Sequence, residues 1–192
     1  MTYIYPHEGK RVRDIKEFTG QHLVWEKPRA MSKEFELRAG EEVLATLKWS
    51  KGWWSTLAEA ASAGGKWTFK RSGFLKSKTT ARLPGSESDL ATFEQNWRGA
   101  GILQLSSGST YRWEKDAFWG ARFAWKDATG NPLVRFRYRA LKSGEVEVTP
   151  SAASVSDLPL LVVLGWYVLV SSVQESVAAG GSGGAAAAAA GG

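Results

Sequence analysis

A charge-free stretch near the C-terminus, residues 158–170, constrains the fold more than any other part of the chain. It has no periodic polar face, so it must be buried on every side, in protein or in lipid. Ser156 or Asp157 can cap a helix here, and Pro159 falls in the first turn, where its missing N–H does no harm. The sequence therefore predicts a buried helix over residues 157–176.

The length of the apolar run indicates whether this helix is surrounded by protein or by lipid. The apolar run counts 13 residues, or 16 with Ser171, Ser172 and Val173. A membrane span needs about 20 apolar residues, and shorter runs are more typical of core helices. The flanks also lack the Lys and Arg cluster of an anchored segment. A helix enclosed by protein is the leading interpretation, and a membrane anchor is the alternative.

The residues before the helix alternate apolar and polar side chains with a period of two, which is typical of β-strands. In one predicted hairpin, Phe35 and Leu37 share a face, and Val43, Ala45, Leu47 and Trp49 share a face on the return strand. Predicted strands cover residues 22–26, 34–38, 43–49, 66–71, 74–82, 90–97, 101–105, 109–114, 118–126, 133–139 and 145–149.

Residues 53–63 break this rhythm. Thr56 and Glu59 have the spacing of a capping box, the alanines favour helix, and Gly64 and Gly65 can end it. We expect a short surface helix or turn there.

Strand spacing of this kind indicates a β-sandwich or a β-barrel. Residues 21–150, at roughly eleven residues per strand and turn, allow about twelve strands. A barrel of that size can hold a central helix, whereas an eight-stranded barrel is filled by its own side chains. We predict a mainly β fold, a closed antiparallel β-barrel of about twelve strands around a central hydrophobic C-terminal α-helix.

The predicted wall faces the helix with large side chains, and Gly165 would let one of them approach closely. These inward residues are Trp67, Phe69, Tyr111, Trp113, Phe123, Trp125, Val134, Phe136 and Tyr138.

One domain accounts for most of the chain. Residues 1–20 form a polar, loosely packed N-terminal lead-in, residues 21–176 form the barrel with its helix, and residues 177–192 form a Gly/Ala-rich tail that is predicted to be disordered. The N-terminus lacks a basic segment followed by an apolar run, so no signal peptide is predicted. We expect a cytoplasmic protein, and binding at the membrane surface is the alternative location.

The order of elements resembles the Tubby C-terminal-like superfamily, which includes Tubby, phospholipid scramblase and LURP-one-related proteins. The resemblance covers roughly residues 21–176, and the chain is most similar in character to the short bacterial members of this superfamily. It rests on residues 64–73 (GGKWTFKRSG), Asn96-Trp97 with Gly99 and Gly101, residues 111–113 (YRW) and residues 160–167 (LLVVLGWY). Tubby-type domains bind phosphoinositide headgroups on a basic outer surface, so the resemblance implies a lipid-binding function.

Catalytic signals are sparse. The chain has no cysteine, and its two histidines, His7 and His22, have no metal-ligand spacing around them. Motifs for an acyl-transfer serine and for a phosphate-binding loop are absent from the sequence. We predict no enzyme activity, no metal and no cofactor, while a pair of carboxylates that meet only in space remains open.

Basic residues supply the candidate binding site. The net charge is +6, and residues 1–150 carry +8 because residues 151–192 contain only Asp157 and Glu175. Three arginines at period two share the outer face of one strand, about 7 Å apart, and guanidinium groups suit phosphate oxygens. A second basic concentration lies at residues 66–78. The predicted headgroup-binding residues are Arg135, Arg137, Arg139, Lys142, Lys70 and Arg71. The alternative is an outer strand face whose arginines pair with Glu or Asp on adjacent strands.

These observations favour a non-enzymatic binding module that docks anionic phospholipid headgroups through a basic outer wall. One alternative is a structural or scaffold protein with a protein partner, and another is a tail-anchored membrane protein with a scramblase-like role. Nucleic acid is disfavoured, because base stacking needs exposed aromatic rings and most of the aromatics alternate against the charges.

Overall fold

The computed structural model describes residues 12–29, 32–50, 56–73, 77–116, 123–140 and 143–178. Twelve antiparallel strands, each paired with its neighbours in sequence, form a barrel that closes where β1 pairs with β12. The strands are β1 His22–Glu26, β2 Glu34–Ala39, β3 Glu42–Trp49, β4 Leu57–Ser62, β5 Gly65–Ser72, β6 Ser77–Arg82, β7 Ala91–Gln95, β8 Gly101–Leu105, β9 Thr110–Glu114, β10 Phe123–Lys126, β11 Pro132–Ala140 and β12 Ser143–Val148. The predicted fold class is confirmed.

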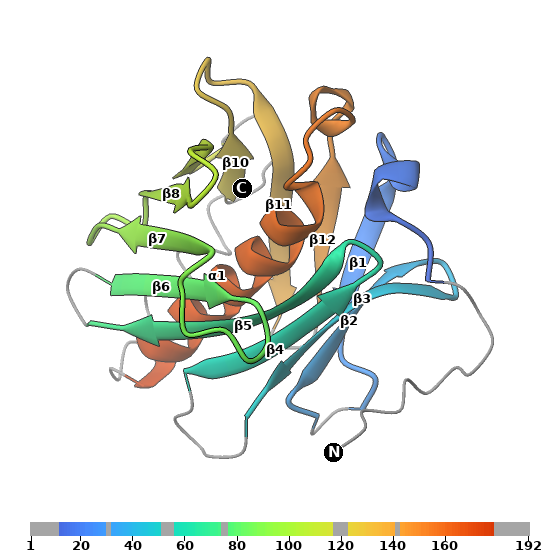
Figure 1. Ribbon diagram of the computed structural model, residues 1–192. Coiled ribbons are helices and arrows are strands. Elements are labelled where there is room, and N and C mark those ends of the chain that lie inside the picture. Colours follow the sequence, from blue (N-terminus) through green and yellow to red (C-terminus); the bar gives the residue numbers. More distant parts are fainter. Residues whose placement is uncertain are drawn as a thin grey trace.

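Helix α1, Leu158–Ala178, runs through the ring of strands (Figure 1). It begins one residue later and ends two residues later than predicted. Among the described residues one segment, Leu158–Ser176, is long and apolar enough to cross a membrane, and 78% of it is buried inside the barrel. The wall of the barrel therefore supplies the apolar surroundings that a segment without a polar face requires.

Aromatic side chains fill the space between α1 and the wall. Trp166 stacks on Trp25 of β1 with ring centroids 5.8 Å apart, and Tyr167 stacks on Trp49 of β3 at 5.7 Å. Gly165 lies against Phe136 and Trp125, and a Cβ at this position would stand 2.7 Å from Trp125 Nε1. That indole N–H donates to the carbonyl of Leu161 at 2.8 Å. The predicted close approach at Gly165 is confirmed.

Polar contacts fix both ends of α1. At its start, the Tyr111 hydroxyl donates to Asp157 Oδ2 at 2.8 Å, and Gly64 lies against the Pro159 ring. Near its end, Arg71 Nη2 donates to Glu175 Oε2 at 2.8 Å. The helix is thus held at two opposite ends of the barrel, and each end collects alternate connections between strands.

The expected helix or turn at residues 53–63 is wrong for the described part, because Leu57–Ser62 form strand β4. Ala58 and Ala60 are buried, and they pair with the much larger Phe69 and Trp67 of β5. Without β4, the ladders of β3 and β5 would have unpaired edges, and that loss outweighs the helix propensity of alanine. Trp53 and Trp54 lie outside the described residues.

A register shift changes which side of β3 faces inward. The pairing of β2 with β3 shifts between Leu37 and Arg38, so Leu44 as well as Ala45 is buried, whereas Val43 is only half-buried. The prediction that Val43 shares the inward face of Ala45 is therefore wrong, because the extra residue of a β-bulge reverses the alternation beyond it. Most of the other predicted wall residues are buried, and Phe123 and Tyr138 are half-buried against the core.

The N-terminal lead-in packs more closely than predicted over its described residues. A short 3₁₀ helix, η1 (Ile15–Phe18), buries Ile15 and Phe18 in the core, and the N–H of Gly20 donates to the carbonyl of Val148 at 2.7 Å. A second 3₁₀ helix, η2 (Pro150–Ala152), lies between β12 and α1. The predicted disorder of the tail concerns residues that, from 179 onward, lie outside the described part.

Alkaline pH is expected to weaken the barrel through its buried phenols. Burial and the hydrogen bond to Asp157 raise the pKa of Tyr111 to about 12, and burial raises that of Tyr138 to about 12. Burial also raises the pKa of Tyr167, whose hydroxyl contacts the carbonyl of Thr56.

A raised folded-state pKa means that the protonated phenol stabilises the fold fully below the ordinary pKa of about 10. This stabilisation is lost as pH rises toward 12. Phenolate absorbance and circular dichroism followed together across this window should change cooperatively, and Tyr111→Phe should remove part of the pH dependence. Titration of all tyrosines near pH 10, independent of any change in circular dichroism, would contradict this prediction.

Candidate functional site

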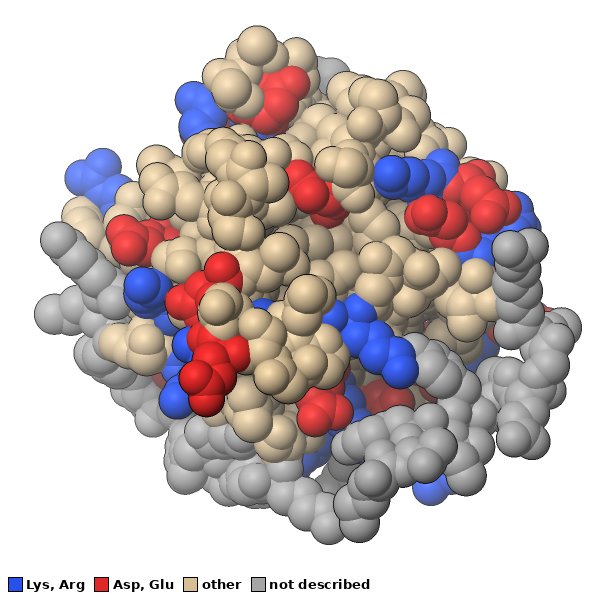
Figure 2. All heavy atoms as spheres, viewed as in Figure 1, with Lys and Arg blue, Asp and Glu red and all other residues tan. Residues whose placement is uncertain are grey.

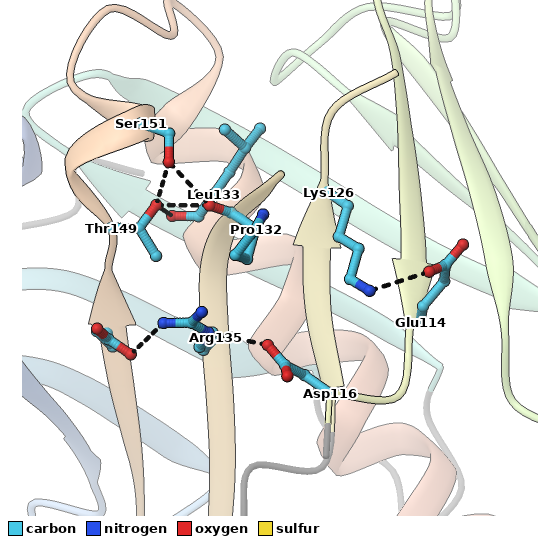
Figure 3. Close-up of polar contacts among 9 residues, drawn as sticks. Glu114, Asp116, Lys126, Pro132, Leu133, Arg135, Thr149 and Ser151 are labelled. Carbon is cyan, nitrogen blue, oxygen red and sulfur yellow. Dashed lines mark hydrogen bonds and ion pairs between the residues drawn. The ribbon is translucent and has the colours of Figure 1, made fainter. Parts of the chain in front are cut away.

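The first arginine of the predicted row is held by carboxylates on both sides (Figure 3). Arg135 Nε donates to Asp116 Oδ2 at 2.8 Å, and its Nη1 donates to Glu147 Oε2 at 3.0 Å. Partial burial alone would lower the pKa of Arg135, but the hydrogen bonds to Glu147 and Asp116 raise it above its ordinary value. With its side chain 18% exposed, Arg135 is a structural link between β11, β12 and the segment after β9.

The other two arginines of the row share one carboxylate. Arg137 stands directly across from Glu145 in the β11–β12 ladder, with Nη1 at 3.8 Å from Glu145 Oε2. Arg139 also contacts Glu145. Exposure rises along the row, to 42% at Arg137 and 58% at Arg139, toward the end of β11.

The three arginines therefore face three carboxylates, and the row has no net charge. The alternative interpretation, an outer face whose arginines pair with acidic residues on adjacent strands, describes this geometry. Basic and acidic side chains are interspersed on the face of the barrel seen in Figure 2. Exposed ion pairs of this kind contribute little to stability individually, so the pairing mainly cancels the field of the row.

The second predicted basic group divides between the two sides of the wall. Lys70 is exposed on the outer face of β5, as expected. Arg71 was expected with it, but its side chain is 5% exposed and lies on the inner face with Trp67 and Phe69. Successive residues of a strand point to opposite faces, so Arg71 cannot share the outer face of Lys70. Lys142 lies outside the described residues.

Arg71 is directed to the helix instead of to solvent. Its Nη2 donates a hydrogen bond to Glu175 Oε2, and its Nε forms an ion pair with Oε1 at 2.7 Å without a hydrogen bond of good geometry, so the guanidinium group contacts α1 at both carboxylate oxygens. Two-point contacts between guanidinium and carboxylate have a defined orientation as well as charge attraction. Arg71 thus positions the last turns of the helix.

Charge separates between two sets of connections, one at each end of the barrel, and the residues before β1 add Arg13 and Lys16 beside the acidic set. Consecutive antiparallel strands place alternate connections at the same end, and the Arg71–Glu175 contact shows which end receives the C-terminus of α1. The described residues of the connections at that end are 27–29, 32–33, 50, 56, 73, 96–100 and 115–116. The opposite end comprises residues 40–41, 63–64, 83–90, 106–109, 127–131 and 149–157.

Among the described residues, the first set contains five basic residues and one acidic residue, and the second contains no basic residue and five acidic ones. We call these ends the basic end and the acidic end. The described basic residues are Lys27, Arg29, Lys33, Arg98 and Lys115. The acidic residues of the other end are Glu41, Glu87, Asp89, Asp127 and Asp157.

Described residues already establish this polarity. Arg29, Lys33, Arg98 and Lys115 are exposed at the basic end. The one acidic residue there, Asp116, is buried and accepts a hydrogen bond from Arg135 of the wall. Its negative charge therefore neutralises Arg135 and leaves the positive charge of the basic end unbalanced. Sequence reasoning missed this grouping, although reading every second connection of a twelve-strand barrel would have found it.

No family model, curated protein or solved structure matches the chain.

The described side chains of the basic end are mainly cationic. Within the described ranges, no three His, Asp or Glu side chains gather into a set that could hold a metal ion. The basic end offers ammonium and guanidinium groups from several connections, a surface that attracts anions.

Proposed function

We propose that this protein is a non-enzymatic binding module that docks its basic end on anionic phospholipid headgroups. The observation that carries the proposal is the segregation of charge between the two sets of connections. The wall row contributes less than the sequence indicated, because Asp116, Glu145 and Glu147 balance its charge. Its most exposed member, Arg139, stands near the end of β11 and so adjoins the basic end.

The magnitude of the charge favours a membrane surface as the partner. Each Lys or Arg near an anionic membrane contributes about 1 kcal/mol, so several acting together give useful affinity without a shaped pocket. The acidic end would point away from the membrane, which orients the barrel as well as attracting it. A one-sided field of this kind steers association with an oppositely charged partner.

The dipole of α1 explains only a small part of the segregation. Its negative end lies at the basic end and its positive end at the acidic end, so both sets of charges favour the helix. That effect is worth about 0.3–1 kcal/mol per charge and acts within one helical turn. A few residues such as Asp157 would be enough to provide it, whereas the described basic residues lie on three separate connections, between β1 and β2, β7 and β8, and β9 and β10.

A relationship to the Tubby C-terminal-like superfamily is part of this proposal. A closed twelve-stranded barrel around a hydrophobic helix supports it, as does a basic surface suited to headgroups. The scramblase-like alternative draws on Leu158–Ser176, which has the length and hydropathy of a membrane span. It requires the barrel to release a helix that it now buries, so surface docking is the simpler reading.

Vesicle co-sedimentation tests this function. Wild-type protein should bind phosphatidylcholine vesicles that contain phosphatidylglycerol at low ionic strength and should dissociate as salt is raised, because screening weakens attraction between exposed charges. Arg29→Gln/Lys115→Gln should weaken binding roughly thirtyfold, at about 1 kcal/mol for each charge removed.

Lys66→Gln/Arg82→Gln is the matched control, because it removes the same charge at the start of β5 and the end of β6, next to the acidic end. It should bind nearly as well as wild type. Equal losses in both variants would show a response to net charge alone and would overturn end-on docking. Retention on vesicles at high salt would favour helix insertion, and no binding to anionic vesicles would overturn the proposed function.

A further inference from the structure

An exposed tryptophan marks one connection of the basic end. The side chain of Trp97, between β7 and β8, is 76% exposed, the most of any large hydrophobic residue in the described chain. Two other exposed large hydrophobics, Leu57 at the start of β4 and Ile102 near the start of β8, lie toward the same end. The fold gains little from Trp97, so its position calls for another explanation.

The turn that carries Trp97 is held by a dense set of hydrogen bonds. Asn96 Oδ1 accepts from the N–H of Arg98 at 2.9 Å and from that of Ala100 at 3.2 Å. The N–H of Asn96 donates to the carbonyl of Ala100 at 2.8 Å, and Gly99 closes the turn with a φ of 85°. Gly99 is suited to this backbone, because other residues adopt it only with strain.

Buried polar groups hold the turn from below. Gln95 is buried, and its Nε2 donates to the carbonyl of Gly99 at 2.8 Å. Its Oε1 accepts from the Ser77 hydroxyl at 3.3 Å, which ties the turn to β6. Because the turn is already ordered, presenting Trp97 to a partner costs little conformational entropy.

Arg98 adds a cation beside the indole. Its guanidinium carbon lies 4.7 Å from the centroid of the Trp97 ring, a cation–π contact. Tryptophan prefers the interface between water and the acyl chains, where its ring lies at headgroup level. A guanidinium group at the same depth can bind phosphate oxygens in two-point geometry.

We propose that the turn at residues 96–100 is a membrane-interface anchor, in which Trp97 enters the headgroup region of an anionic bilayer and Arg98 binds lipid phosphate. This inference rests on the proposed function and adds the point and depth of contact. The two groups reinforce each other, because the indole supplies apolar burial and the arginine supplies charge attraction.

The absence of native cysteine allows a site-specific test on the full chain. Trp97→Cys labelled with a nitrobenzoxadiazole fluorophore should brighten and shift to the blue with phosphatidylglycerol vesicles, because the label leaves water. Leu83→Cys, labelled in the same way, is the matched control, since Leu83 is exposed on a connection of the acidic end. Its emission should stay constant.

Unlabelled variants measure the contribution of each group. Trp97→Ala should weaken vesicle binding roughly tenfold through lost apolar burial, at unchanged thermal stability. Arg98→Gln should weaken it severalfold and reduce its dependence on salt.

If the labelled Trp97→Cys protein co-sediments with anionic vesicles but its label does not respond, the anchor is overturned and the proposed function stands. If Trp97→Ala binds as wild type does, the anchor is overturned as well. A label response without vesicles that grows with protein concentration would identify Trp97 as a protein contact. If the wild-type protein does not bind anionic vesicles, both proposals fall together.

Discussion

A chain that ends at Ser156 is expected to lose cooperative unfolding altogether. Eleven large side chains of α1 are buried between Leu158 and Val170. Burying each contributes about 1.5–3 kcal/mol, so together they supply on the order of 15–30 kcal/mol. That sum exceeds the net stability of about 5–15 kcal/mol that is typical of domains, and the barrel would retain a wide apolar interior with nothing to fill it.

Thermal and urea unfolding, followed by tryptophan fluorescence and circular dichroism, would measure this effect. The matched control is a chain that ends at Ala178 and lacks only residues 179–192, which contain neither charge nor large apolar side chains. It should unfold as wild type does. A sigmoidal transition at the wild-type midpoint in the chain ending at Ser156 would show that the strands form a stable barrel alone.

Local patterns predicted most of the barrel. Alternation identified eleven of the twelve strands, and the apolar run identified the helix, because both signals depend on which side chains face the interior. Strand β4 was missed since Ala58 and Ala60 have weak local preference for strand. Their conformation is set by the large residues on either side, Trp67 and Phe69 on β5 and Leu47 and Trp49 on β3.

The candidate site was harder to predict, because its charges meet through pairing between strands. Glu145 and Glu147 lie at the same period as Arg135 and Arg137, but only the register of β11 with β12 places them opposite. Arg71 could have been assigned inward from the sequence, as it shares the parity of Trp67 and Phe69.

The two ends of the barrel differ in chemistry as well as in charge. At the acidic end, η1 and η2 adjoin the start of α1, and Asp127 accepts hydrogen bonds from Thr129 and Asn131 in a tight turn. These hydrogen bonds lower the pKa of Asp127, chiefly the one from the Thr129 hydroxyl. The described connections of the basic end are cationic, and one of them presents the exposed indole of Trp97 beside Arg98.

Substitution of Gly165 should destabilise the fold by overpacking the contact between α1 and the wall. A Cβ there would stand 2.7 Å from Trp125 Nε1 and still closer to the Phe136 ring. Both wall residues are fully buried, and their rings pack against Trp113 with centroids 4.7 and 5.4 Å away. Neither has space to move, so overpacking costs about 1–3 kcal/mol, occasionally more. Displacing Trp125 also breaks its hydrogen bond to Leu161.

We expect Gly165→Ala to lower the free energy of unfolding by about 2 kcal/mol, although alanine is the better helix former by about 1 kcal/mol. Gly165→Leu should lower it by about 4 kcal/mol or more. Urea unfolding at constant m-value measures both changes. The opposite sign for Gly165→Ala, a gain of about 1 kcal/mol, would mean that helix propensity decides and that the wall yields.

A double-mutant cycle identifies the contact that is responsible. Phe136→Leu alone creates a cavity and should destabilise the protein, whereas in the Gly165→Ala background the smaller side chain makes room for the new methyl group. The double variant should therefore be more stable than the sum of the two single changes predicts, by about 1–2 kcal/mol of coupling. Val163→Ala with Phe136→Leu serves as the comparison, because it removes volume at both positions and relieves no clash. If the Gly165 cycle shows no coupling, the Phe136 ring does not limit the approach of α1 to β11, and the tight fit lies against Trp125.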